Sequence, residues 1–153
     1  MNSPADLHLK FNIRPSPVLA EHRPLYKIGQ LLLILWLSSR GRKSSFPRLH
    51  LFNWALKNNS RFARLKNAAD ANSLKIAAWG FDPALAIAIR FAEAEGLISV
   101  AGKGISLTEA GEAFAKDIMQ DDDVLVREKG MLRSISRGVT EGMVEDAAKE
   151  WQP

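Results

Sequence analysis

Few side chains in this sequence have the types and spacing that catalysis or metal binding requires. The three histidines, His8, His22 and His50, are scattered, and no His-x-x-x-His pair is present. The chain has no cysteine, which excludes thiolate metal sites, thiol nucleophiles and disulfides. No Ser-His-acid grouping can be argued from the spacing. We therefore expect a protein that is not an enzyme, with no catalytic residue, no metal site and no cofactor.

Two short runs look superficially like ligand sites. Asp121-Asp122-Asp123 could attract a cation, but it lacks the spacing and the closing glutamate of a calcium loop. Gly102-Lys103-Gly104 lacks the Gly-x-x-x-x-Gly-Lys-Ser/Thr frame of a phosphate loop. We interpret the first run as a solvated helix end and the second as a turn.

Basic residues are concentrated in one part of the chain. Residues 22–69 contain ten Lys or Arg and no acid, whereas residues 70–153 contain nine Lys or Arg and fifteen acids. Such asymmetry favours a polyanion or an acidic protein surface as partner, the alternative being a solvated face without one. For Arg61 and Arg64, pairing with acids of the C-terminal half is a further alternative. The candidate contacts to DNA phosphates or to an acidic partner are Arg40, Arg42, Lys43, Arg48, Lys57, Arg61, Arg64, Lys66 and Lys103.

The apolar periodicity predicts a mainly α-helical protein. Helices are expected at about residues 25–39, 45–57, 60–67, 84–95, 109–120, 124–132 and 140–151. The first contains a run of seven large apolar residues and should be buried on nearly all sides. The second should turn Arg48, Asn53 and Lys57 outward.

Local signals place the ends of these helices and a β-hairpin. The predicted helix N-caps are Ser45, Ser60, Asp82, Thr108 and Thr140. Segments 97–100 and 105–107 alternate in polarity around a glycine-bearing turn, which predicts a hairpin. Segment 7–14 has the alternation of a strand, and residues 70–81 suit either a short strand or a helical turn.

Three helices, a hairpin and another helix, in this order, are typical of a winged helix. The sequence "GLISVAGKGISLTEAGEAFAKDI" is similar to the end of a recognition helix, the wing and the following helix in that class. We therefore expect an extended arm over residues 1–24, a winged-helix domain over 25–120 and a helical extension over 121–153.

The expected recognition helix, residues 83–95, is poorly suited to reading bases. Its only basic residue is Arg90, small and aliphatic residues surround its axis, and two glutamates near its end would repel phosphates. A protein contact is the better interpretation. The candidate protein-interface residues are Ile87, Arg90, Met143, Val144 and Trp151.

No targeting or membrane segment is evident from the sequence. The first ten residues lack a long apolar stretch, and the most apolar run, residues 31–37, is far shorter than the roughly 20 residues of a membrane span. We expect a cytoplasmic protein that does not enter a membrane.

Four blocks in order resemble one family of small subunits. The blocks are "LLLILWL", "RLHLFNWALKN", "ISLTEAGEAFAKDI" and "VTEGMVEDAAKEW", spread over residues 23–151. The chain thereby resembles the small middle components of bacterial ABC-three-component systems, which are Lamassu-like anti-phage defence operons. The resemblance implies partners from the same operon, namely an SMC/Rad50-like ATPase and an effector that is often a nuclease. It implies no catalytic residue.

The leading hypothesis is a non-enzymatic adaptor that bridges this ATPase and the effector and that contacts the backbone of double-stranded DNA without reading its sequence. One alternative is a homodimeric winged-helix transcriptional regulator with residues 121–151 as its dimer helices. Another is an antitoxin-like inhibitor of an enzyme.

Overall fold

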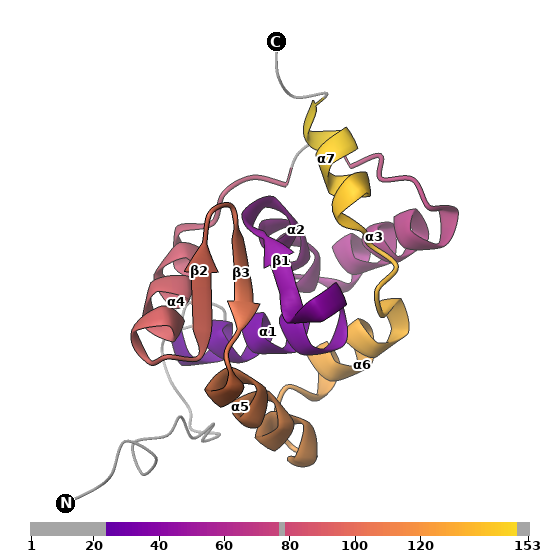
Figure 1. Cartoon of the computed structure of the whole chain (residues 1–153). Helices are drawn as coiled ribbons and strands as arrows, with labels where there is room; N and C mark the ends of the chain where they lie inside the picture. Colours follow the sequence, from indigo (N-terminus) through magenta and orange to yellow (C-terminus); the bar gives the residue numbers. More distant parts are fainter. Residues whose placement is uncertain (1–23, 77–78, 150–153) are drawn as a thin grey trace, which may run out of the picture.

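A computed structural model describes residues 24–76 and 79–149 of the chain. Within these residues it contains seven α-helices and one small antiparallel sheet, so the prediction of a mainly helical protein is confirmed (Figure 1). The expected strand at 7–14, the arm to which it belongs and the candidate interface residue Trp151 lie outside the described residues.

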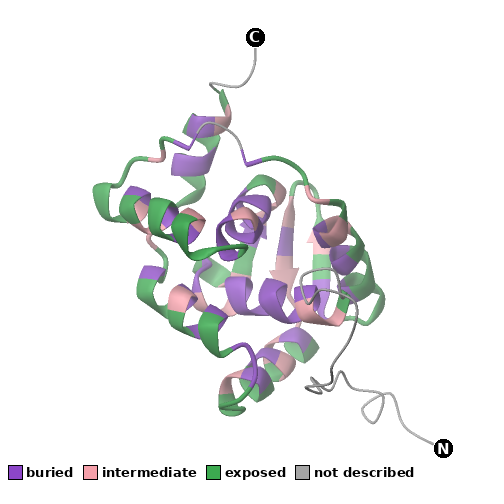
Figure 2. Cartoon of the chain, turned by 180° about the vertical axis from the view of Figure 1, so that it is seen from behind, coloured by how far each residue is buried: buried purple, intermediate pink, exposed green. Residues whose placement is uncertain are grey.

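Helix α1 (Pro24–Leu37) forms the centre of the molecule. Residues 31–35 are all inaccessible to solvent, because α4, α5, α6 and α2 pack around this helix. In Figure 2 the ribbon of α1 is mostly purple, the colour of buried residues, whereas the outer helices are largely green. An apolar helix without a polar face has this position in a folded domain, as the sequence predicted.

Helices α2 (Phe46–Leu56) and α3 (Asn59–Ala71) follow one another with a break of two residues. The side chain of Ser45 caps α2 as expected. The cap of α3 is Asn58 and not Ser60: the Asn58 Oδ1 accepts from the Arg61 amide at 2.8 Å, and the helix runs beyond residue 67 to Ala71. Asn58 and Ser60 are both cap-forming residues, and the extended backbone of Asn58 decides between them.

The sheet has one strand that the sequence did not predict. The hairpin of β2 (Ile98–Ala101) and β3 (Gly104–Leu107) is confirmed. A third strand, β1 (Lys43–Ser45), lies in a region expected to be loop and pairs with β3, which gives the sheet order β1-β3-β2. A short 3₁₀ turn (Arg40–Arg42) leads into β1, and two of its residues have positive φ, Gly41 at +67° and Arg42 at +59°.

Helix α4 (Pro83–Ala94) begins where Asp82 and Pro83 predicted, with the Asp82 side chain as cap. Thr108 caps α5 (Glu109–Gln120) at the base of the hairpin. In the ambiguous segment 70–81, residues 70 and 71 are the last two residues of α3. The other described residues of this segment form neither a strand nor a helix.

The C-terminal part of the described chain is packed onto the rest. Helix α6 (Val126–Ile135) packs on α1 and α3, and α7 (Glu141–Lys149) packs on α2. The expectation that Met143 and Val144 face a partner is wrong, because both side chains are buried within the chain itself. None of the helices in residues 24–76 and 79–149 has both the length and the apolar character needed to cross a bilayer.

Candidate interaction surfaces

Helix α4 exposes apolar side chains on the face that points away from the core. Leu85, Ala88, Ile89 and Ala92 are buried against α1, whereas Ile87 is 43% and Phe91 51% exposed. These two residues are one turn apart and so share a face. We call Ile87, Phe91 and the neighbouring exposed Arg90 the α4 stripe.

The α4 stripe has the chemistry of a protein contact. Exposed Glu93 and Glu95 lie on the last turns of the helix and at its end, where they would repel phosphates. Large apolar side chains left in water favour burial against another apolar surface. The structure thus agrees with the sequence in leaving Ile87 and Arg90 available, and it adds Phe91.

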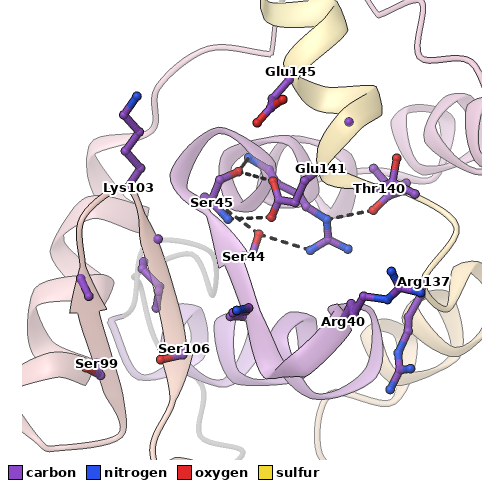
Figure 3. A pocket seen from close by; sticks show the side chains of 17 residues that line it. Arg40, Ser44, Ser45, Ser99, Lys103, Ser106, Arg137, Thr140, Glu141 and Glu145 are labelled. Carbon is purple, nitrogen blue, oxygen red and sulfur yellow. Dashed lines mark hydrogen bonds between the residues drawn. The ribbon is translucent and has the colours of Figure 1, made fainter.

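A second surface is a cleft of about 850 Å³ between the open face of the sheet and α7. Figure 3 shows side chains of β1, β2, β3 and the segment before α7 around it. Hydroxyl groups of Ser44, Ser45, Ser99, Ser106 and Thr140 line it. Four exposed cations line it as well: Arg40, Lys43, Lys103 and Arg137.

The strands explain how these cations come together. Lys43 begins β1 and Lys103 lies at the tip of the β2–β3 hairpin, so antiparallel pairing of β1 with β3 places both on one sheet. Arg40 precedes β1, and Arg137 lies in the turn before α7. Arg137 was not predicted from the sequence, because only the packing of α7 near the sheet places it at this cleft.

Arg48 also lines the cleft, but its guanidinium is not available to a ligand. Only 3% of the residue is exposed, which corrects the expectation that it faces outward and contacts phosphate. Its Nε donates to the Val139 carbonyl at 2.9 Å, and Nη1 donates to Ser39 Oγ at 2.8 Å. Nη2 donates to the Ser38 carbonyl. Burial lowers the pKa of Arg48 to about 10, although the charge of Glu141 acts in the opposite direction.

Glu141 fastens the first turn of α7 to the start of α2. Its carboxylate accepts from the Ser45 amide at 2.9 Å and from Ser45 Oγ at 2.6 Å (Figure 3). A carboxylate is favourable at a helix N-terminus because the unpaired amides there carry partial positive charge. With Glu145, the cleft has two carboxylates against its four exposed cations, so its charge stays positive.

The remaining candidate cations lie elsewhere. Arg42 is in the adjoining turn, but its guanidinium lies 4.0 Å from the centre of the Trp36 ring and 3.8 Å from Glu112. On α3, the guanidinium groups of Arg61 and Arg64 lie 5.2 and 5.4 Å from the centre of the Trp54 ring. This aromatic partner was not foreseen. The same helix contains Lys66, whose Nζ pairs with Asp70 at 2.8 Å.

A third surface is a pocket of about 500 Å³ between α2, α3 and the segment before α4. We call it the aromatic pocket, because His50, Trp54, Trp79 and Phe81 line it. Lys57 and Arg61 are its cationic lining. This pocket was not predicted from the sequence, and the close run of Trp79, Phe81 and Asp82 is the signal that could have indicated it.

A polar network forms the base of the aromatic pocket. The Asp82 carboxylate accepts from Asn53 Nδ2 at 2.8 Å and pairs with Lys57 at 3.1 Å. The Asp82 amide donates to His50 Nδ1 at 3.2 Å. Asn53 is buried and accepts from Lys27 Nζ at 2.7 Å, so its predicted outward position is wrong.

This network shifts the pKa values of two of its members. Burial raises the pKa of Asp82, but the hydrogen bonds from Asn53, Lys57 and the Ala84 amide outweigh it, and the result is about 2. Burial lowers the pKa of His50 below 6.5, and the nearby charge of Asp82 opposes this change.

The structure therefore separates the predicted basic candidates into groups. Arg40, Lys43 and Lys103 meet at the cleft, whereas Lys57, Arg61, Arg64 and Lys66 lie along α2 and α3.

Within residues 24–76 and 79–149, no cluster of three or more His, Asp or Glu has a geometry that could hold a metal ion. The chain matches no protein-family model, no curated protein and no solved structure.

Proposed function

We propose that this chain is a non-enzymatic adaptor, built on a winged helix, that joins an SMC-like ATPase to the effector of an anti-phage defence complex. The observation that supports it most is the α4 stripe: Ile87 and Phe91 are exposed on the helix immediately before the hairpin. On a winged-helix scaffold this is the helix that would otherwise enter the major groove.

The sheet supports the winged-helix assignment. A strand before α2 that pairs with the second strand of the later hairpin, in the order β1-β3-β2, is the arrangement we infer to be the wing and its supporting strand. Helix α3 is then an addition between the second helix and the recognition helix.

The partner that the α4 stripe fits is an apolar groove with an acidic edge. Ile87 and Phe91 would fill the groove, and Arg90 would meet a carboxylate beside it. A coiled-coil ATPase offers such grooves between its helices, with acids on the neighbouring helical positions. We therefore assign the α4 stripe to the ATPase and not to DNA.

A specific observation also favours a contact with the DNA backbone. The cleft presents four exposed cations and the hydroxyl groups of Ser99, Ser106 and Thr140, which suit phosphate oxygens. Asn and Gln, the side chains that read adenine, are absent from its lining residues, and we assign its cations to phosphates. Contact there would be independent of DNA sequence.

The regulator alternative has less support. It needs the helices of residues 121–151 for dimerisation. In the described part of that segment, Leu132, Ile135, Val144 and Ala147 are buried within the chain itself.

Co-purification of the chain with the ATPase encoded in the same operon tests the proposal. We expect Ile87→Asp with Phe91→Asp to abolish the complex. The matched control is Val126→Asp, because Val126 is 59% exposed on α6 and lies outside the α4 stripe. The proposal fails if the wild-type chain never co-purifies, or if the control variant loses the ATPase to the same degree.

A further inference from the structure

We propose that the aromatic pocket binds an unpaired nucleobase of a single-stranded nucleic acid, with phosphates of the same strand on Arg61 and Arg64. This inference goes beyond the proposed function, since it requires only the isolated chain. It rests on four features of the pocket: an exposed aromatic ring, walls held by hydrogen bonds, a positively charged edge and a small volume.

The exposed ring is that of Phe81. It is 71% exposed, the highest value among the large apolar side chains in the described residues. Its inner side lies against His50, with 5.0 Å between ring centres and 32° between ring planes. A ring supported in this way presents a flat apolar surface at a fixed position. Such a ring is a stacking platform for a base of any identity.

The pocket is held in shape before a ligand arrives. Trp79 Nε1 donates to the Pro47 carbonyl at 2.9 Å, which fixes the indole on the start of α2. The hydrogen bond from the Asp82 backbone amide to His50 Nδ1 fixes the residue that follows Phe81. A preformed site binds more tightly because less conformational freedom is lost on binding.

The edge of the pocket has the charge that a phosphate chain requires. Arg61 lines the pocket, and Arg64 lies over the same Trp54 ring. The carboxylate of Asp82 also lines the pocket, but its ion pair with Lys57 and the hydrogen bonds from Asn53 and the Ala84 amide offset its repulsion of an anion. A single strand of nucleic acid could therefore run from Phe81 along α3.

The volume selects unpaired bases over a duplex. About 500 Å³ accommodates a ligand of the size of one nucleotide, and it cannot admit a base pair with its backbones. Inside a duplex each base face is covered by its neighbour, so an unpaired strand offers many more accessible faces than a duplex does. A hydrophobic side chain of a protein partner is the other occupant to be tested.

Fluorescence anisotropy with labelled oligonucleotides tests the inference. The probes are a 12-residue poly-dT strand, a 12-residue poly-rU strand and a 12-base-pair blunt duplex, at one fixed salt concentration. We expect tighter binding of the single strands than of the duplex. Quenching of tryptophan emission should accompany it, because Trp54 and Trp79 line the pocket. The two single strands distinguish DNA from RNA as the source of the base.

Variants then locate the contact. Phe81→Ala should weaken single-strand binding about 5- to 150-fold, which corresponds to the loss of one stacked base. Phe81→Trp should keep it. Val126→Ala is the control, because Val126 is exposed on α6 outside the pocket and outside the α4 stripe, and it should leave the affinity unchanged. Phe81 is a surface residue, so these variants should remain folded.

Three results would overturn the inference: equal affinity for single strands and duplex, unchanged binding by Phe81→Ala, or loss of the ATPase and not of the oligonucleotide in that variant. The last would assign Phe81 to a protein partner. Failure of the proposed adaptor function is distinguishable, because it is measured as loss of the ATPase from the wild-type chain.

Discussion

The Arg48 guanidinium, on the first turn of α2, donates to the carbonyl of Val139, which lies ninety-one residues later and precedes α7. Together with the Glu141 bonds to Ser45, it ties the C-terminal helix to the start of α2. The same guanidinium satisfies the Ser38 carbonyl at the end of α1. One buried side chain thus joins three segments that are distant in sequence.

Replacement of Arg48 should be costly. Arg48→Met leaves the Ser38 and Val139 carbonyls without this donor in a buried site, and we expect a loss of about 2–4 kcal/mol in the free energy of unfolding. Urea titration measures it. Arg64→Met is the control, because an exposed cation over an aromatic ring contributes about 1 kcal/mol or less. Equal, small losses in both variants would contradict the role assigned to Arg48.

Two glycines within helices should respond to alanine in opposite directions. A Cβ at Gly111 in α5 would lie 1.9 Å from the Leu97 carbonyl oxygen, a backbone atom at the start of the hairpin. We expect Gly111→Ala to destabilise the chain by about 1–3 kcal/mol. At Gly130 in α6 a Cβ meets nothing within 4 Å, so Gly130→Ala should stabilise by about 0.5–1 kcal/mol. A stabilising Gly111→Ala would mean that α5 does not pack against the hairpin as described.

Acid should weaken the fold through the base of the aromatic pocket. Because the pKa of His50 is lower in the folded chain than 6.5, its contribution to stability is full above that pH and is lost as the pH falls below it. Asp82 behaves alike over a lower window, since its pKa falls from 3.8 to about 2 on folding. Unfolding free energies should therefore decrease as the pH is lowered from 7.5 to 5, the range in which the unfolded chain takes up a proton at His50.

The matched variant for this pH dependence is His50→Asn. The side-chain oxygen of an asparagine can accept the hydrogen bond from the Asp82 amide, and the asparagine does not titrate in this range. It should show a shallower slope between pH 7.5 and 5 than the wild type. Identical slopes would show that another group is responsible.

Charge reversal should separate the two basic surfaces. We expect Arg61→Glu, Arg64→Glu and Lys66→Glu together to weaken binding of single-stranded DNA at low salt, with Lys66 contributing least because Asp70 already pairs with it. Arg40→Glu, Lys43→Glu and Lys103→Glu together should weaken binding of duplex DNA, because the cleft is the surface assigned to its backbone. Each lost phosphate contact should reduce the slope of log affinity against log salt by about 0.9.

The control for these charge variants is Arg90→Glu, because the α4 stripe is assigned to protein. It should leave duplex affinity unchanged. A large loss of affinity in this variant, with no loss in the other two sets, would place the DNA contact on α4.

The helices and the hairpin were predictable from the sequence because their signals are local. Asp82-Pro83 and Thr108 mark helix starts through groups that lie within a few residues of one another. The central position of α1 followed from its lack of a polar face. The three-residue strand β1 could not be predicted, since it exists only through its pairing with β3 some sixty residues later.

The candidate sites were predictable only in part, and for the same reason. A buried Arg48 and an exposed Arg40 look alike in a basic run, and only the packing of α7 distinguishes them. Met143 and Val144 were predicted to meet a partner because they are apolar, but apolar character does not say whether a helix face meets the same chain or another one.

The most direct test of the account is a photocrosslinking residue at position 91, in the complex of the chain, the ATPase and duplex DNA. We predict a crosslink to the ATPase, because Phe91 lies on the face assigned to protein. A crosslink to the DNA duplex instead would show that α4 occupies a groove, and it would contradict the central claim.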